Sequence, residues 1–457
     1  MKKQLHKLFT ATTVMFLLFS ANIQSQINPT LAGQLQTALN NRVTNYGNHG
    51  VSACVIMPNG DVWKGVAGVG QNSVAICDST VFNGASITKA NIATLILLLV
   101  EDGTLHLDSS WHKYIDLNVS FDTTITLRQL LNHTSGIADF LETPSAGTLI
   151  TSNFNHAFTP VEILETIVPS APAFAAGTNF QYSTSNYALL ALIAQTVTGN
   201  PVQQTLHSRI WDPLGMTHTS FGGFENFTEP HAGVWWNFGS GLVNYSNNPK
   251  TSMLTFGYGG ANIVTTPEDL AIFARALFTG TLLTQNSLNA MKVFSANSYT
   301  SWCAGYGLGI HNSHLYSNNS VLGHDGDYTN MSDMFHSYDY GFTLVTMSNT
   351  AKQWFGIFDG MYNTIKNYLT VGIIENEGDG RIDLYPNPAN NKLTINLGNN
   401  SKQVEITICD LNGKIIYTTT STERQVLVNT KEFAEGVYFV KVRTEDLIAT
   451  KKLVITQ

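Results

Sequence analysis

The sequence predicts an α+β protein. One antiparallel β-sheet, built from distant parts of the chain, is flanked by helices and carries an inserted helical subdomain; a small all-β sandwich follows. Strand-like runs occur near the N-terminus, at 51–70, and again at 301–310, 332–338 and 341–349. Between them, apolar residues recur at helical spacing. Strands at both ends of a region with a helical middle indicate that the two ends pair in one sheet.

Residues 1–25 predict a secretory signal peptide. Three lysines in the first seven residues precede an apolar stretch from Leu8 to about Ala21, and we expect cleavage after Ser25. This stretch is shorter than the ~20 residues that a membrane span needs, which favours cleavage over an anchor. No later segment is long and charge-free enough to span a membrane.

The elements of the large domain follow in order. Residues 31–46 have helical spacing of Leu and Val, and the turn Pro58-Asn59-Gly60 divides the first strand-like region into a hairpin. Residues 84–103 and 188–199 predict apolar helices that each end at a glycine. Residues 353–369 predict the last helix.

A separate C-terminal domain is expected. Residues 371–380 predict a linker, which gives the preceding domain the bounds 26–370. Residues 381–457 hold short alternating strands separated by turns, a pattern typical of a small β-sandwich that can fold alone.

Charge and cysteine content exclude several classes of function. The net charge is −8, with +3 on residues 1–25 and +2 on residues 381–457, which leaves −13 for the middle. Such an acidic body argues against nucleic acid as a partner, because that binding depends on cationic contacts to phosphate. No HExxH motif, clustered acidic pair or glycine-rich phosphate loop appears, so the sequence supports no metal and no other cofactor.

The four cysteines are Cys54, Cys77, Cys303 and Cys409. They form no close CxxC pair, which argues against zinc. Export would permit a Cys54–Cys77 disulfide, and four separate buried thiols are an equal alternative.

Ser86 and Lys89 are the first candidates for chemistry. They stand at i and i+3 at the start of the apolar helix, so both side chains project from one face. A serine hydroxyl is a poor nucleophile unless a base takes its proton, and a lysine with a depressed pKa can be that base. The alternative is a helix cap beside a first-turn lysine, because this spacing often occurs by chance.

The surrounding sequence favours the chemical interpretation. Six segments occur in order over about residues 30–370: FNGASITKANIATLILLLVEDGTLHLD, ITLRQLLNHTSGIADF, AGTNFQYSTSNYALLALIAQTVTG, DPLGMTHTSF, GGANIVTTPEDLAIFARAL and GHDGDYTNMSDMF. Together they resemble the serine hydrolase family of class C β-lactamases, D-Ala-D-Ala carboxypeptidases, D-aminopeptidases and related esterases. The resemblance implies the β-lactamase/transpeptidase-like fold, with Ser86 forming an acyl-enzyme and Lys89 as its partner.

Two further motifs of that family have counterparts here. Its Tyr-x-Asn motif resembles Tyr182-Ser183-Thr184, which implies that Tyr182 shares the proton transfers. Thr184 replaces an asparagine that donates an amide hydrogen to the substrate, and it offers only a shorter hydroxyl. His133, in LLNHTSG, is expected to support the loop beside the site.

The family's Lys-Thr-Gly or His-x-Gly motif resembles His324-Asp325-Gly326. The resemblance implies that His324 orients or relays a proton and that Gly326 permits close backbone approach. The backbone N–H groups of Asp327 and Ser86 would form the oxyanion hole.

Asp325 and Asp327 suggest the substrate class. Two carboxylates beside the site would repel a substrate carboxylate, which β-lactams and D-Ala-D-Ala termini both carry. A neutral ester or amide, or a substrate with a free amine, is therefore expected over a penicillin. The resemblance as a whole implies a D-amino-acid peptide, a peptidoglycan-type peptide or a small ester as substrate. The alternatives are aspartates that point into solvent, a β-lactamase, and a catalytically silent ligand-binding protein, since Thr184 departs from the family pattern.

The C-terminal segments LYPNPANNKLTI, ICDLNGKIIYTT, GVYFVKV and KKLVITQ resemble the sorting domain of the type IX (Por) secretion system. That resemblance implies contact with outer-membrane secretion machinery and a secreted or cell-surface location. A carbohydrate-binding sandwich is the alternative; the short length, the absence of Trp and the terminal Lys-Lys pair favour sorting.

Overall fold

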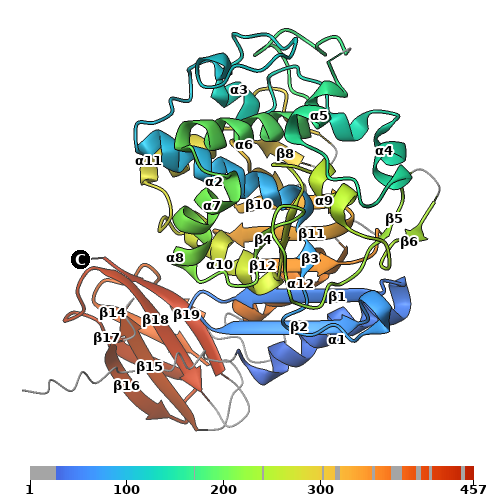
Figure 1. Cartoon of the computed structure of the whole chain (residues 1–457). Helices are drawn as coiled ribbons and strands as arrows, with labels where there is room; N and C mark the ends of the chain where they lie inside the picture. Colours follow the sequence, from blue (N-terminus) through green and yellow to red (C-terminus); the bar gives the residue numbers. More distant parts are fainter. Residues whose placement is uncertain are drawn as a thin grey trace, which may run out of the picture.

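The protein is described by a computed structural model, in which two bodies follow one another along the chain (Figure 1). The predicted signal peptide and nearly all of the predicted linker lie outside the described residues. No described helix is long and apolar enough to cross a membrane. The structure describes residues 27–168, 170–238, 241–300, 303–313, 320–351, 356–371, 383–397, 403–410, 414–443 and 448–456.

A seven-stranded antiparallel sheet forms the centre of the large domain, in the order β2-β1-β12-β11-β10-β9-β8. The N-terminal hairpin joins the C-terminal strands through β1 and β12, with Val51 opposite Ser348. This pairing confirms the prediction that the two ends of the domain share one sheet. The strands are β1 (Gly50–Ile56), β2 (Val62–Gly68), β8 (Cys303–Tyr306), β9 (His311–Ser313), β10 (Val321–Tyr328), β11 (Asn330–Ser337) and β12 (Thr343–Ser348).

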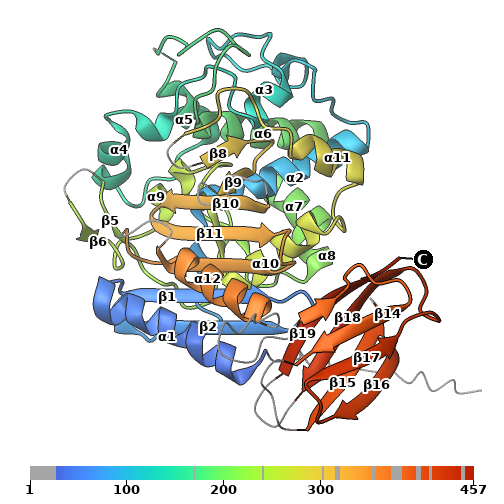
Figure 2. The same cartoon turned by 180° about the vertical axis from the view of Figure 1, so that it is seen from behind.

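Two terminal helices, α1 (Pro29–Tyr46) and α12 (Gly356–Val371), cover one face of the sheet, as Figure 2 shows. Apolar side chains of these helices, such as Leu35 of α1 and Phe358 of α12, share one core with strand residues such as Phe335 of β11. The opposite face supports a larger core that includes the remaining helices. The sheet is therefore covered on both sides, and β10 and β11 bury polar residues such as His324 and Asp333 as well as apolar ones.

The helical middle of the domain lies on that opposite face. Its helices are α2 (Thr88–Glu101), α3 (Leu127–Leu131), α4 (Ala146–Ser152), α5 (Pro160–Glu165), α6 (Thr184–Thr198), α7 (Val202–Leu206), α8 (Asp212–Leu214), α9 (Thr251–Phe256), α10 (Pro267–Phe278) and α11 (Gln285–Met291). Two small sheets accompany them: β3 (Phe82–Asn83), β7 (Ile263–Thr265) and β4 (Ser220–Phe221) form one, and β5 (Trp235–Trp236) and β6 (Val243–Asn244) form the other.

The predicted helices are confirmed with shifted starts. The helix expected from residue 84 begins as an α-helix only at Thr88, because Ala85 has a positive φ of 48° that no α-helix contains. The helix expected from residue 188 begins at Thr184, four residues earlier. Its polar first turn, which includes Ser185 and Asn186, is buried and hydrogen-bonded to the 133–140 loop, a tertiary effect that the apolar pattern does not show.

The C-terminal body consists of two small antiparallel sheets. One contains β13 (Asp383–Tyr385), β14 (Lys392–Asn396) and β17 (Gln425–Asn429); the other contains β15 (Val404–Asp410), β16 (Ile415–Ser421), β18 (Gly436–Arg443) and β19 (Ile448–Ile455). Their inward side chains form a separate core, whose described members all lie between Leu384 and Ile455. The predicted all-β domain is therefore present, with its own hydrophobic core.

The cysteines do not pair in the structure. Cys54 is buried in β1, Cys303 is buried in β8 and Cys77 is exposed on a loop; these and Cys409 are all free thiols. The structure thus favours separate thiols over the Cys54–Cys77 disulfide, although Cys77 is not buried.

Candidate active site

Ser86 lies in a 3-10 turn, η2 (Ala85–Ile87), between β3 and α2, and its side chain is partly exposed. The turn packs closely on β10: a Cβ atom added at Gly326 would lie 2.8 Å from Cβ of Ala85 and 2.8 Å from the Gly84 carbonyl oxygen. The positive φ of Ala85 costs about 1–3 kcal/mol, which the surrounding packing must offset. Ser86 is therefore presented on a tightly fixed turn, and the close approach expected at Gly326 is present.

The substitution Gly326→Ala is expected to lower both the thermal midpoint and the rate of hydrolysis. The added methyl group would overlap Ala85 and Gly84, and overpacking of this kind costs about 1–3 kcal/mol. Gly360→Ala is the matched control, because nothing lies within 4 Å of its added Cβ in α12. Thermal melts and initial rates of both variants test this; equal behaviour would contradict the packing argument.

Lys89 is fully buried in the first turn of α2. Its Nζ donates to Ser86 Oγ at 3.1 Å and to the Gly260 carbonyl oxygen at 2.8 Å, and it lies 4.7 Å from the ring centre of Tyr182. Burial lowers the pKa of Lys89 to about 7, against the opposing effects of the negative charges of Asp139 and Asp325. An amine with this pKa is substantially neutral near pH 7 and can accept the serine proton.

Tyr182 completes the group around Ser86. Its side chain is partly exposed, and its hydroxyl is hydrogen-bonded to Ser86. Desolvation raises the pKa of Tyr182 well above its usual value, although the bond with Ser86 acts in the opposite direction, so the phenol is protonated at neutral pH. The ring of His133 lies against it, with centroids 4.4 Å apart. Ser86, Lys89 and Tyr182 therefore meet at one point.

His324 is buried in β10 and reaches the site through a second tyrosine. Its Nε2 is hydrogen-bonded to the Tyr306 hydroxyl at 2.9 Å, and its Nδ1 is bonded to the Asp325 carbonyl oxygen. Burial lowers the pKa of His324 well below its usual value, so the imidazole is neutral. The Tyr306 and Tyr182 rings lie 5.9 Å apart at their centroids. A relay role for His324 stays a prediction.

Asp325 is also buried, and its Oδ1 is 2.6 Å from Nε2 of His311 in β9. Ligand atoms of His311, His324 and Asp325 all lie within 4.8 Å of one another, a spacing that could hold a metal ion. In the structure, however, these atoms are engaged in hydrogen bonds with protein groups. We therefore interpret the three residues as a hydrogen-bonded chain. It withdraws Asp325 from the substrate contact that the sequence suggested.

Thr184 is buried at the start of α6, and its hydroxyl is directed at Asp139. Its Oγ1 donates to Asp139 Oδ2 at 3.0 Å, and its backbone N–H donates to the same oxygen at 2.9 Å. The hydroxyl therefore has no hydrogen left for a substrate carbonyl. For this reason we do not carry the expected substrate-binding role of Thr184 into the proposed function.

Asp327 is the exposed acidic group of the β10 segment. Desolvation by the surrounding protein, reinforced by the negative charges of Asp325 and Glu142, raises the pKa of Asp327 to about 6. Within the described residues, β9 pairs with β10 only at Leu322 and Gly323, so β10 has an unpaired edge beyond this point. That edge is where a bound substrate could reach the expected Asp327 N–H.

Sequence reasoning missed Asp139, Gly260, Tyr306 and His311. Asp139 lies in ITLRQLLNHTSGIADF, one of the six segments that resemble the family. An acidic residue between apolar neighbours in such a segment could have indicated a functional role. Tyr306 and His311 lie on the short strands β8 and β9, and their inward direction follows only from strand pairing. His133, expected to support the loop, accepts a hydrogen bond at Nδ1 from the Ser183 N–H at 3.1 Å.

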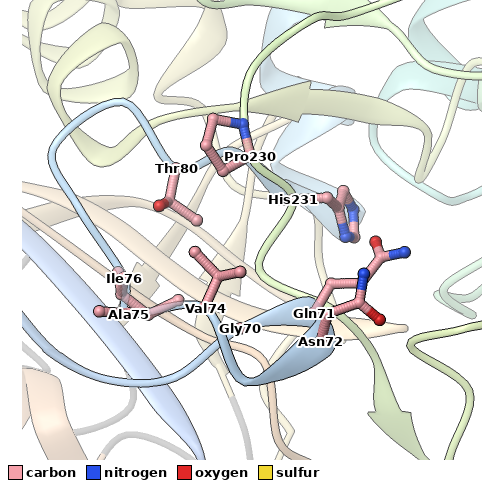
Figure 3. Close-up of a pocket in the computed structure, with 9 residues that line it drawn as sticks. All are labelled: Gly70, Gln71, Asn72, Val74, Ala75, Ile76, Thr80, Pro230 and His231. Carbon is pink, nitrogen blue, oxygen red and sulfur yellow. The ribbon is translucent and has the colours of Figure 1, made fainter.

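Two cavities lie near these elements. One, of about 230 Å³, is lined by the loop 70–80 with Pro230 and His231 (Figure 3). His231 there is bonded to Asn83, three residues before Ser86. The second, of about 320 Å³, is mainly apolar and borders residues 135–138. Neither cavity is lined by a site residue predicted from the sequence.

Parts of this chain are similar in sequence to known bacterial proteins. Putative penicillin-binding protein PbpX of Bacillus subtilis (strain 168) is 32% identical over 53% of this chain and 56% of its own length. Protein flp of Staphylococcus aureus (strain NCTC 8325 / PS 47) is 28% identical over 44% of this chain and 39% of its own length. The chain thus matches about half or less of these relatives.

Solved structures align over more of their length. A D-stereospecific amidohydrolase from Streptomyces sp. has a TM-score of 0.63 and 26% identity, covering 72% of this chain and 98% of that chain. D-amino acid amidase from Ochrobactrum anthropi SV3, complexed with L-phenylalanine amide, has a TM-score of 0.65 and 27% identity, covering 74% and 99%.

Both the large domain and the C-terminal domain match known protein families. Residues 383–456 match the secretion system C-terminal sorting domain, and residues 35–363 match Beta-lactamase. Since the second match spans well over half of the sequence, the chain belongs to the beta-lactamase family of serine hydrolases, and it carries a secretion sorting domain at its C-terminal end.

Proposed function

We propose that this protein is a secreted hydrolase that cleaves amide or ester bonds through a covalent acyl-enzyme on Ser86. The observation that carries the proposal is the contact of Lys89 Nζ with Ser86 Oγ at 3.1 Å, with Tyr182 bonded to the same serine. A nucleophile, a buried amine and a phenol at one partly exposed point are the groups that acyl transfer requires.

In the proposed reaction, Ser86 Oγ attacks the substrate carbonyl carbon while its proton passes to neutral Lys89. The carbonyl oxygen becomes negative, and the backbone N–H groups of Ser86 and Asp327 would stabilise it. The C–N or C–O bond then breaks, and Lys89 returns the proton through Tyr182 to the leaving group. Water hydrolyses the resulting ester and restores the Ser86 hydroxyl.

Charge at the entrance favours a substrate with a free amine near the scissile carbonyl. Asp327 is exposed there, and the negative charges of Asp325 and Glu142 act on it, so a cation would relieve their mutual repulsion. Thr184 offers no donor for the acyl-amide group that β-lactams and N-acylated peptides carry. The similarity to D-amino acid amidase also supports a D-amino acid amide or short D-peptide.

A matched substrate pair tests both proposals. We expect kcat/KM for D-alanine p-nitroanilide to exceed that for its N-acetyl derivative by up to about fivefold, because an ion pair with the exposed Asp327 adds roughly 0.2–1 kcal/mol. The ratio should rise with pH through about 6, as Asp327 loses its proton. Any effect of Lys89 cancels in this ratio. Asp327→Asn should make the ratio smaller and independent of pH.

Control substrates and variants separate the alternatives. Ser86→Ala should abolish hydrolysis of every substrate and labelling by a fluorophosphonate. Nitrocefin as the best substrate would instead indicate a β-lactamase and refute the amine preference. A wild-type protein that neither reacts with the fluorophosphonate nor turns over any substrate would favour a ligand-binding protein on this fold.

A further inference from the structure

Lys89 must change charge during the proposed reaction inside a buried environment. Its described polar contacts, Ser86 Oγ and the Gly260 carbonyl, are neutral oxygens. The other titratable groups around it are His133, His324, Tyr182 and Tyr187, whose imidazoles and phenols are neutral near pH 7. A developing ammonium there needs a carboxylate near enough to stabilise it.

The negative charges of Asp139 and Asp325 both favour the protonated form of Lys89, and the two carboxylates differ in their hydrogen-bond partners. Asp325 is bonded to His311, whose imidazole takes up one of its oxygens. Asp139 is only 7% exposed and, within the described part of the chain, forms no ion pair with any side chain at salt-bridge distance. The negative charge of Asp139 opposes the lowering of the Lys89 pKa by burial, and the positive charge of Lys89 in turn opposes the raising of the Asp139 pKa by burial.

The Asp139 carboxylate is held by three donors. Oδ2 accepts from the Thr184 N–H and hydroxyl, and Oδ1 accepts from the Leu141 N–H at 3.0 Å. Hydrogen bonds of this kind favour the ionised form and oppose the effect of burial. They also tie the 139–141 turn to the start of α6, two residues after Tyr182.

Gly260 lies between Thr184 and Lys89, whose Nζ donates to the Gly260 carbonyl oxygen. A Cβ atom at Gly260 would lie 2.4 Å from Thr184 Cγ2 and 3.4 Å from Lys89 Nζ. Thr184 therefore lies between the Asp139 carboxylate and the lysine side of the site. Where the family pattern has asparagine, Thr184 of this chain hydrogen-bonds the buried Asp139 and so links it to the segment that carries Tyr182.

We propose that Asp139 is a positioning residue of the active site. Its carboxylate fixes the Tyr182–Thr184 segment through Thr184 and supplies the negative charge that lets the buried Lys89 hold a proton. This inference rests on the proposed function, in which Lys89 takes the proton of Ser86. It assigns to Asp139 an electrostatic effect on Lys89 that a purely structural hydrogen-bond acceptor would not have.

The test compares Asp139→Asn with Thr184→Val. Asp139→Asn removes the charge and keeps an oxygen acceptor, so the rising limb of the pH profile of kcat/KM should move down by roughly one pH unit. Thr184→Val removes one hydrogen bond but leaves the carboxylate and the backbone N–H bond. It should reduce the rate without moving that limb.

A second measurement needs no turnover. The pH dependence of the free energy of unfolding, compared between each protein and its Lys89→Met partner, reports the protonation of Lys89 directly. A downward shift in Asp139→Asn alone supports the proposal, even if the wild type proves inactive and the proposed function fails. An unchanged limb and an unchanged unfolding profile would overturn it.

Folding of the variants is checked by thermal melting. If Asp139→Asn does not fold, Asp139→Ser replaces it, because the smaller side chain leaves room for a water to meet the Thr184 N–H. Failure of both to fold would assign Asp139 to the scaffold alone and overturn the electrostatic role.

Discussion

Replacing Lys89 with methionine is expected to reduce kcat/KM for the preferred substrate by about 10²–10⁴-fold. The amine is the buried group in contact with Ser86 Oγ, and loss of a general base with its hydrogen bond typically removes 10²–10⁴ of rate. Methionine has a similar length and no charge, so it should fill the same space in α2. Initial rates and fluorophosphonate labelling of the folded variant measure the effect.

The pH dependence gives this prediction a sign. Wild-type activity should rise as pH increases through about 7, because Lys89 accepts a proton only when it is neutral. The unfolded lysine has a pKa of 10.5, above the folded value, so the unfolded state binds the extra proton between these pH values. Wild-type stability should therefore increase from about pH 7 towards 10.5. Lys89→Met should lack this increase.

The matched control for this substitution is Lys113→Met, which removes an exposed lysine whose Nζ lies over the ring of its neighbour Tyr114. It should leave both the rate and the pH dependence of unfolding close to those of the wild type. Retention of more than about a tenth of the activity by Lys89→Met would exclude the lysine as the principal base. Tyr182 would then be the remaining candidate at the same serine.

The parts of the fold that local pattern determines were predictable. Apolar spacing located α1 and α6, and the turn at residues 58–60 located the β1–β2 hairpin. The Ser86–Lys89 contact also followed from spacing, because three residues bring side chains together in a 3-10 turn as well as in an α-helix.

What could not be predicted depends on residues that meet only after folding. Nothing near Thr184 in the sequence shows that its hydroxyl donates to Asp139, 45 residues earlier. Nor could spacing show that His311 takes up the carboxylate of Asp325, since that contact depends on the pairing of β9 with β10. The strained φ of Ala85 likewise reflects packing against Gly326, which lies far along the chain.

Deleting residues 381–457 is expected to abolish export across the outer membrane while leaving the hydrolase folded and active. The tail matches a secretion sorting domain, and its described core contains only residues of the tail. The cores of the large domain draw on described residues from Ile27 to Leu369. The measurement is hydrolytic activity in the medium, on the cell surface and in the cell interior of a host with type IX machinery.

Because the two domains have separate hydrophobic cores, the deletion distinguishes a role of the tail in stability from a role in export. If the tail contributed to the stability of the hydrolase, truncation would lower the thermal midpoint and the specific activity together. If it only directs export, both should match those of the full-length protein, and the activity should accumulate inside the cell. Full-length Ser86→Ala is the complementary control, because it should be exported although it is inactive. Normal secretion of the truncated protein would refute the sorting role and leave a substrate-binding sandwich as the better interpretation of the tail.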